Sequence, residues 1–120
     1  MARHGAIAAL ARAIAAQTVA GRWQGVVLDI EELPQTAQAR YLRLVTATRA
    51  LLAKQNLSTA VTVETEQEPG YLRSLGQTAD AVILMDYDYH WQGGEPGPIA
   101  PQDWFAEQSA IARRAISPAK

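Results

Sequence analysis

The sequence predicts an α/β fold with parallel strands. Three short, apolar, β-branched segments alternate with longer segments in which apolar residues recur every three or four positions, and each short segment is followed by acids. Parallel strands need crossover connections, which the helical segments supply. The 120 residues suit one domain and are too few for a complete eight-stranded β/α barrel of about 250 residues. We therefore expect one α/β unit, either a small open sheet or a piece of a larger sheet or barrel.

The first half of the chain predicts a helix, a strand and a second helix. Residues 5–19 are Ala-rich, with apolar residues on one helical stripe. Residues 25–31 (GVVLDIE) are typical of a buried strand that ends in acids. Pro34 then interrupts the chain, Thr36 is the expected helix cap, and Asn56 is the expected end of that helix. The apolar stripe of this second helix consists of Tyr41, Leu44, Val45, Leu51 and Leu52, with Thr48 as its one polar member.

The second half repeats the alternation. Residues 59–65 (TAVTVET) alternate in polarity as a strand does, and residues 69–76 predict a short helix that starts with Pro-Gly. Residues 81–87 (AVILMDY) predict a third strand, and the Gly- and Pro-rich residues 93–98 a loop. A last helix is expected over residues 104–116. Three aromatic residues are expected in the core, namely Trp23 against the first helix and Trp104 and Phe105 at the start of the last.

Composition excludes several classes of function. The chain has 11 Lys+Arg and 12 Asp+Glu, a net charge of −1, so no basic surface for nucleic acid is indicated. No apolar run reaches the ~20 residues of a membrane span, and no cleavage pattern follows the apolar N-terminal segment, so we expect neither a span nor a signal peptide. The chain lacks Cys, which excludes thiolate chemistry and leaves the compartment open.

The acids gather where parallel strands end. Nine of the twelve acids lie in residues 29–32, 64–68 and 86–95, and functional side chains in parallel α/β folds collect at the carboxyl ends of strands. Asp29 and Glu31 are two apart on a strand and share a face, as a pair used in acid catalysis would. The acids of residues 64–68 either line a cleft or form a solvated turn, and we favour the turn. No pattern indicates a metal or another cofactor, because His90 has no second His nearby and no Lys-Ser/Thr follows the glycines of the loop.

Two of these strand ends carry motifs. Residues 23–31 (WQGVVLDIE) resemble the fourth-strand signature of family 18 glycoside hydrolases, the chitinase-like enzymes, in which Asp-Gly-x-Asp-x-Asp-x-Glu follows an aromatic residue. Residues 85–88 (MDYD) resemble the sixth-strand Met-x-Tyr-Asp motif of that family. Residues 90–101 are similar to a loop in the chitinase-like segment of large bacterial proteins that also carry polysaccharide deacetylase and glycosyltransferase domains. The resemblance implies that residues 1–120 form a single partial catalytic domain, about strands 4 to 6 of a (β/α)8 barrel.

The resemblance also implies a mechanism and a set of site residues. It implies substrate-assisted hydrolysis of a polymer that contains N-acetylglucosamine, with the substrate's own acetamido oxygen as nucleophile. Glu31 would protonate the leaving oxygen, and Asp29 would orient the acetamido group. Tyr87 would donate a hydrogen bond to that group, completing the catalytic set. Substrate binding would fall to three further residues, namely Asp88, Met85 and Trp91.

The sequence departs from the family pattern at Gln24 and Val27, where the family has Asp. Other interpretations also stay open: Glu31 and Glu32 suit the start of a helix, Tyr87 suits the core, and Trp91 suits a lid over its own loop. Alternatives to a hydrolase are a non-catalytic carbohydrate-binding fragment and an inactive piece of a larger polysaccharide-processing protein. The raw sheet edges of a three-stranded piece also predict self-association.

Overall fold

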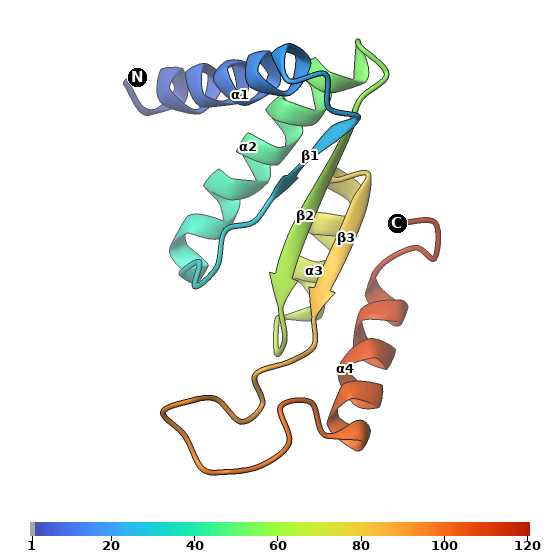
Figure 1. Cartoon of the computed structure of the whole chain (residues 1–120). Coiled ribbons are helices and arrows are strands. Elements are labelled where there is room, and N and C mark those ends of the chain that lie inside the picture. The colour runs from blue at the N-terminus through green and yellow to red at the C-terminus, as the bar shows by residue number, and fades with distance from the viewer. Residues whose placement is uncertain (1) are drawn as a thin grey trace.

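The computed structural model describes residues 2–120, and the side chains of residues 5–120. Its elements follow the expected order, and Figure 1 shows them along the chain. The four helices are α1 (Ala2–Ala20), α2 (Gln35–Ala53), α3 (Pro69–Thr78) and α4 (Gln102–Ala115). The three strands are β1 (Gly25–Leu28), β2 (Ser58–Glu64) and β3 (Ala81–Met85).

The strands form one parallel sheet in the order β1-β2-β3. Leu28 is level with Val61, and Val61 with Val82, so the three strands share one register across the sheet. In Figure 1, α3 lies behind the strands, while no helix among the described residues covers the face turned to the viewer. This confirms the α/β class and the parallel pairing.

The core lies between the sheet and the helices behind it. The second helix contributes Tyr41, Leu44, Val45, Thr48 and Leu52, all buried as its stripe predicts, while Leu51 is partly buried. Val61 and Val63 of β2 point into the same core, whereas the alternate residues of that strand are only partly buried. The alternation expected for this strand is therefore confirmed.

Several helices and strands begin or end at other residues than their side-chain patterns predict. β1 ends at Leu28 and β3 at Met85, so the acidic motifs follow the strands instead of completing them. α2 begins at Gln35 with Pro34 at its N-cap position, not with a Thr36 cap, and ends at Ala53. The helix thus ends three residues before Asn56, the expected end, and Asn56 itself has a φ of 57°, which is not a helical conformation.

Two of the aromatic residues expected in the core are not buried. Trp23 is 67% exposed and Phe105 is 48% exposed, so both predictions are wrong. The indole of Trp23 lies over Gly21, since a Cβ at that glycine would come within 2.2 Å of its Nε1 atom. Trp104 is partly buried and packs near Tyr89, with ring centroids 5.2 Å apart. Aromatic character predicts contact with a surface, but only neighbouring elements decide whether that contact buries the ring.

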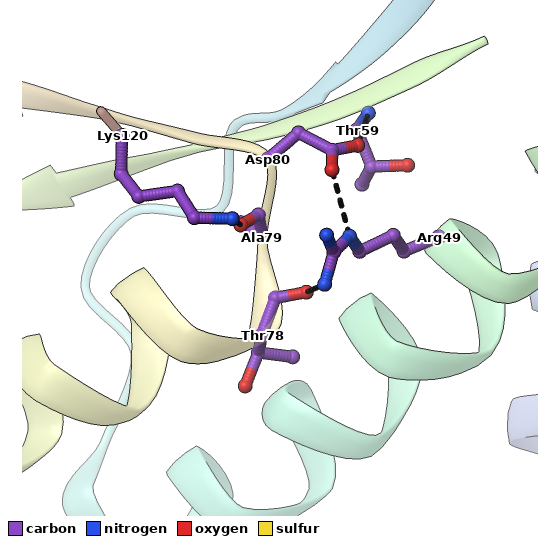
Figure 2. A network of polar contacts seen from close by, with 6 residues as sticks. All are labelled: Arg49, Thr59, Thr78, Ala79, Asp80 and Lys120. Carbon is purple, nitrogen blue, oxygen red and sulfur yellow. Dashed lines mark hydrogen bonds and ion pairs between the residues drawn. The ribbon is translucent and has the colours of Figure 1, made fainter. Parts of the chain in front are cut away.

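A polar network joins the amino ends of β2 and β3 to α2 (Figure 2). The Nε atom of Arg49 lies 2.7 Å from an oxygen of Asp80. The other oxygen of Asp80 accepts a hydrogen bond from the N–H of Thr59, and the N–H of Asp80 donates to the carbonyl of Thr59. Lys120 donates to the carbonyl of Ala79, close by. This network holds the amino ends of β2 and β3, at the end of the sheet opposite to the acidic motifs.

Within the described residues, no helix combines the length and the apolar character that a bilayer crossing requires.

Candidate functional site at the carboxyl ends of the strands

The residues that lead to the acidic motifs lie on the uncovered face of the sheet, at matching levels of neighbouring strands. Val27 and Ala60 are level on this face, as are Glu64 and Met85 further along. Beyond Leu28, the last paired residue of β1, a side-chain contact joins the two segments: the hydroxyl of Thr62 donates a 2.7 Å hydrogen bond to the carboxylate of Asp29. One face of the sheet therefore leads directly to the residues that the motifs single out.

A hollow of about 260 Å³ lies where the strands end. Six residues from all three strand ends line it: Glu31, Glu64, Thr65, Met85, Tyr87 and Asp88. Four of the six predicted site residues are thus together, although they come from segments more than 50 positions apart in the sequence. The hollow is small and polar, and Glu31, Tyr87 and Asp88 are exposed at its surface.

Asp29 and Trp91 are not among the residues that line this hollow. Asp29 is exposed and bonded to Thr62 on the neighbouring strand. Trp91 is 64% exposed in the loop between β3 and α4. Asp29 directly follows β1, as the sequence predicts, whereas Trp91 lies in the loop six residues after the end of β3. The direction of each side chain depends on neighbours that a motif does not specify.

Backbone and buried contacts hold the ends of β1 and β2. The hydroxyl of Tyr41 donates a 3.0 Å hydrogen bond to the carbonyl of Leu28, directly before Asp29. Burial, with smaller effects from Tyr71 and Asp29, raises the pKa of Tyr41 to about 12, so this hydroxyl stays protonated and able to donate. Beyond the strand, the N–H of Glu32 donates to the carboxylate of Glu64 at 2.9 Å.

The end of β3 is held from α4. Asp86 is buried, and its carboxylate accepts a 3.0 Å hydrogen bond from the hydroxyl of Ser109. The next residue, Tyr87, donates its N–H to the carbonyl of Met85, which turns the chain sharply. Asp88 follows with a φ of 63°, in the left-handed region that Asp tolerates better than most residues. These bonds direct Tyr87 and Asp88 to the hollow.

Two residues of the site, Thr62 and Thr65, are not predicted from the sequence, and a third, Glu64, is predicted in a turn instead of a cleft. Glu64 and Thr65 line the hollow, and Thr62 binds Asp29. The acids of residues 64–68 were assigned to a solvated turn, which is wrong for Glu64. The alternation of β2 was the available signal, because it places Thr62 and Glu64 on the face opposite to Val61 and Val63.

A larger cavity, of about 530 Å³, lies at the opposite edge of the sheet. Arg49, Thr78 and Asp80 are among its lining residues, and their charged groups are already paired with one another or with backbone. We therefore assign it to the structure of the fold. Among the side chains that the structure describes, no three His, Asp or Glu residues are arranged to hold a metal ion.

The known proteins that this chain is similar to are chitinases, glycosylases and spore cortex-lytic enzymes. No known protein family matches the chain as a sequence profile. An uncharacterized glycosylase of Bacillus subtilis, YvbX, is 27% identical over 92 residues, which cover 69% of this chain and 27% of that protein. The chain thus spans about a quarter of the length of this relative.

Solved structures match over nearly the whole chain. A chitinase from Chromobacterium violaceum matches with a TM-score of 0.82 and 22% identity, over 89% of this chain and 37% of that one. The putative sporulation-specific glycosylase ydhD of Bacillus subtilis has a TM-score of 0.87 and 18% identity, covering 93% of this chain and 40% of its own. The spore cortex-lytic enzyme SleL of Bacillus cereus has a TM-score of 0.80 and 21% identity, over 90% and 27%.

The likeness covers helices, strands and their order, and it spans less than half of each solved chain. At these identities it describes the fold. The resemblance to chitinase-like glycoside hydrolases that the two motifs predict is therefore confirmed for the fold: this chain has the fold of one part of the chitinase and glycosylase structures.

Proposed function

We propose that this chain supplies the acid-bearing part of a glycoside hydrolase site that acts on a polymer containing N-acetylglucosamine. The observation that carries the proposal is the hollow at the strand ends, which brings Glu31 together with Met85, Tyr87 and Asp88. Two separate motifs meet there, in a fold shared with chitinases. In this proposal the three strands correspond to the fourth, fifth and sixth strands of a (β/α)8 barrel.

The proposed chemistry uses the substrate's own acetamido group as nucleophile. Glu31 donates a proton to the leaving glycosidic oxygen while the acetamido oxygen attacks the anomeric carbon. Asp29 accepts a hydrogen bond from the acetamido N–H and stabilises the positive charge that develops. Tyr87 donates its hydroxyl to the acetamido oxygen. Fixed charges and dipoles of this kind stabilise an oxocarbenium-like transition state.

Substrate binding falls to the residues around this centre. In this proposal Asp88 holds a sugar hydroxyl and Met85 forms an apolar part of the wall, and both residues line the hollow. Trp91 offers an exposed indole on which a sugar ring can stack. The partner is thus an oligosaccharide or polysaccharide.

A second candidate function is carbohydrate binding without catalysis. It is favoured by the exposure of Asp29 and Glu31 and by the bond that engages Asp29 with Thr62. A general acid needs a pocket that excludes water and surrounds the reacting bond. In the described part of the chain, the hollow has walls from three strand ends only.

The test compares the wild-type chain with Glu31→Gln and with a matched control, Glu32→Gln, the neighbouring exposed acid. Binding and turnover of N-acetylglucosamine oligomers are measured for all three. If Glu31 is the acid, Glu31→Gln lowers turnover by roughly 10² or more and leaves binding unchanged, while Glu32→Gln retains turnover.

Each other outcome is informative. Equal turnover in wild type and Glu31→Gln removes Glu31 from the acid role. Binding without turnover in all three proteins supports the carbohydrate-binding function. No binding and no turnover in the wild-type chain rejects both functions for residues 1–120.

A further inference from the structure

The loop between β3 and α4 is closed by contacts between its two ends. The N–H of Tyr89 donates a 2.9 Å hydrogen bond to the carbonyl of Ile99. The Nδ1 atom of His90 lies 2.7 Å from the carbonyl oxygen of Pro98, a contact in which a protonated Nδ1 is the donor. Figure 1 shows this segment extending away from the end of the sheet. Residues 89–90 and 97–99 therefore form the neck of the loop.

Gly97 lies directly under the imidazole of His90. A Cβ at this position would come within 2.3 Å of Cε1 and 2.4 Å of Nε2 of His90. Among the glycines that the structure describes, none has a positive φ. The backbone angle of Gly97 therefore does not call for glycine, but a side chain at this position would displace the imidazole of His90 from its present place.

The other face of the neck rests on α4. The rings of Tyr89 and His90 meet edge-on with centroids 4.8 Å apart, and Tyr89 in turn packs near Trp104. His90 therefore has three fixed neighbours: a carbonyl, a glycine and an aromatic ring. A side chain that only faces solvent would not have contacts on three sides.

The neck brackets the residues proposed to bind carbohydrate. Tyr87 and Asp88 lie between the Asp86–Ser109 hydrogen bond on one side and the His90–Pro98 contact on the other. Trp91 follows His90 directly, and its ring lies over Gly93, where a Cβ would come within 2.3 Å of Cζ3. Tyr87, Asp88 and Trp91 are thus adjacent along the chain to the neck residues, Tyr89 and His90.

We propose that His90 is a positioning residue which, with Gly97, clips the neck of the β3–α4 loop and so holds Tyr87, Asp88 and Trp91 in their binding arrangement. The clip is a property of the free chain, and its effect on affinity rests on the proposed carbohydrate-binding site. The contacts of His90 are with Pro98, Gly97 and Tyr89, none of which lines the hollow. In this proposal His90 therefore acts on the site through the backbone. Pre-organising a loop in this way reduces the entropy lost when a ligand orders it.

The test uses five variants of the full chain, four single and one double. His90→Ala removes the clip, and His90→Asn retains a donor near the Nδ1 position. Gly97→Ala displaces the ring without altering its chemistry. Gly70→Ala is the matched control, because a Cβ there meets nothing within 4 Å. The double variant His90→Ala/Gly97→Ala completes a thermodynamic cycle.

Amide hydrogen exchange at Tyr89, followed by NMR, reports on the neck without any ligand. We expect exchange to become about 3–10-fold faster in His90→Ala and Gly97→Ala, as expected for loss of one hydrogen bond. His90→Asn should restore slow exchange, Gly70→Ala should not change it, and the double variant should equal the single variants. Unchanged exchange in His90→Ala and Gly97→Ala would overturn the clip.

Affinity for an N-acetylglucosamine oligomer is the second measurement. The proposal expects Kd to rise about 3–10-fold in the variants with fast exchange, and to recover in His90→Asn. Faster exchange with unchanged Kd would overturn the positioning role. If the wild-type chain binds no oligomer, the proposed function fails, while the exchange data still decide for or against the clip.

Discussion

Tyr41 connects the hydrophobic core to the candidate site through a single hydrogen bond. Its ring is buried in the core, and its hydroxyl donates to the carbonyl of Leu28, the last residue of β1. Asp29 follows immediately. The stripe of α2 predicts that Tyr41 is buried, but a sequence gives no partner for its hydroxyl.

Tyr41→Phe should lower the free energy of unfolding by about 1–2 kcal/mol, because the carbonyl of Leu28 loses its donor in a buried position. Urea denaturation at neutral pH measures the change. The control is Tyr89→Phe, which keeps an exposed ring and should change stability by less than about 0.5 kcal/mol. Equal effects of the two substitutions would show that the hydrogen bond contributes nothing.

The motifs predict some of the residues that line the hollow but not all of them. Residues 29–31 and 85–88 are singled out by their position at strand ends and by their resemblance to two family motifs, and four of their residues line one hollow. For Glu64 the sequence favours a solvated turn over a cleft, because nothing in residues 64–68 matches a motif. Its place follows from the register of β2 against β3, a relation between distant segments.

At the scale of elements, the amino ends of β2 and β3 depend on Asp80. Burial alone would raise the pKa of Asp80, but the hydrogen bonds from Thr59 and Arg49 and the charges of Arg49 and Lys120 lower it below its usual value. Asp80 thus joins two strands and α2 through its ionised form (Figure 2). Part of this network lines the cavity of about 530 Å³ at the amino ends of the strands.

Asp80→Asn should destabilise the fold at neutral pH by about 1 kcal/mol, because the ion pair is partly exposed and such pairs contribute modestly. A lowered pKa in the folded state stabilises the fold above the ordinary pKa of Asp, and this contribution is lost as the pH falls through the folded value. The difference in unfolding free energy between wild type and variant should therefore shrink below about pH 4. Urea unfolding from pH 7 to pH 2 checks this, and a constant difference would contradict it.

Element ends were harder to predict than element types. All seven elements were expected in their order, because periodicity and Gly or Pro punctuation are local. β1 and β3 end earlier than their side-chain patterns suggest. β3 ends level with the end of β2, at the pair Glu64 and Met85, whereas β2 continues beyond the last residue of β1. α2 begins at Gln35, since Pro34 adopts an extended backbone and supplies the start without a side-chain cap.

At the scale of the molecule, the sheet of the described residues has one uncovered face and two unpaired edges. Val27 and Ile83 are about half exposed on the uncovered face, and β1 and β3 each have one edge without a neighbouring strand in the described part of the chain. Unpaired edges and exposed apolar faces favour association. The prediction of self-association stays untested.

We expect the chain to associate with rising concentration, and sedimentation velocity measures this. Ile83→Lys should shift the chain toward monomer, because a charge on the uncovered face opposes burial of that face. Ile99→Lys is the matched control: Ile99 is also exposed, but it lies in the β3–α4 loop away from the sheet. A monomer at all concentrations, or equal effects of both substitutions, would contradict association through the sheet.

The sequence alone determined the class of fold, the order of the elements and the position of the acids at strand ends, because hydrophobic periodicity and chain punctuation act over a few residues. Only the tertiary structure decided which of those acids share a hollow, where each strand stops, and that Trp23 and Phe105 stay exposed. These features depend on which distant segments pack together. Register, burial and side-chain direction are properties of pairs of elements, and a single segment does not contain them.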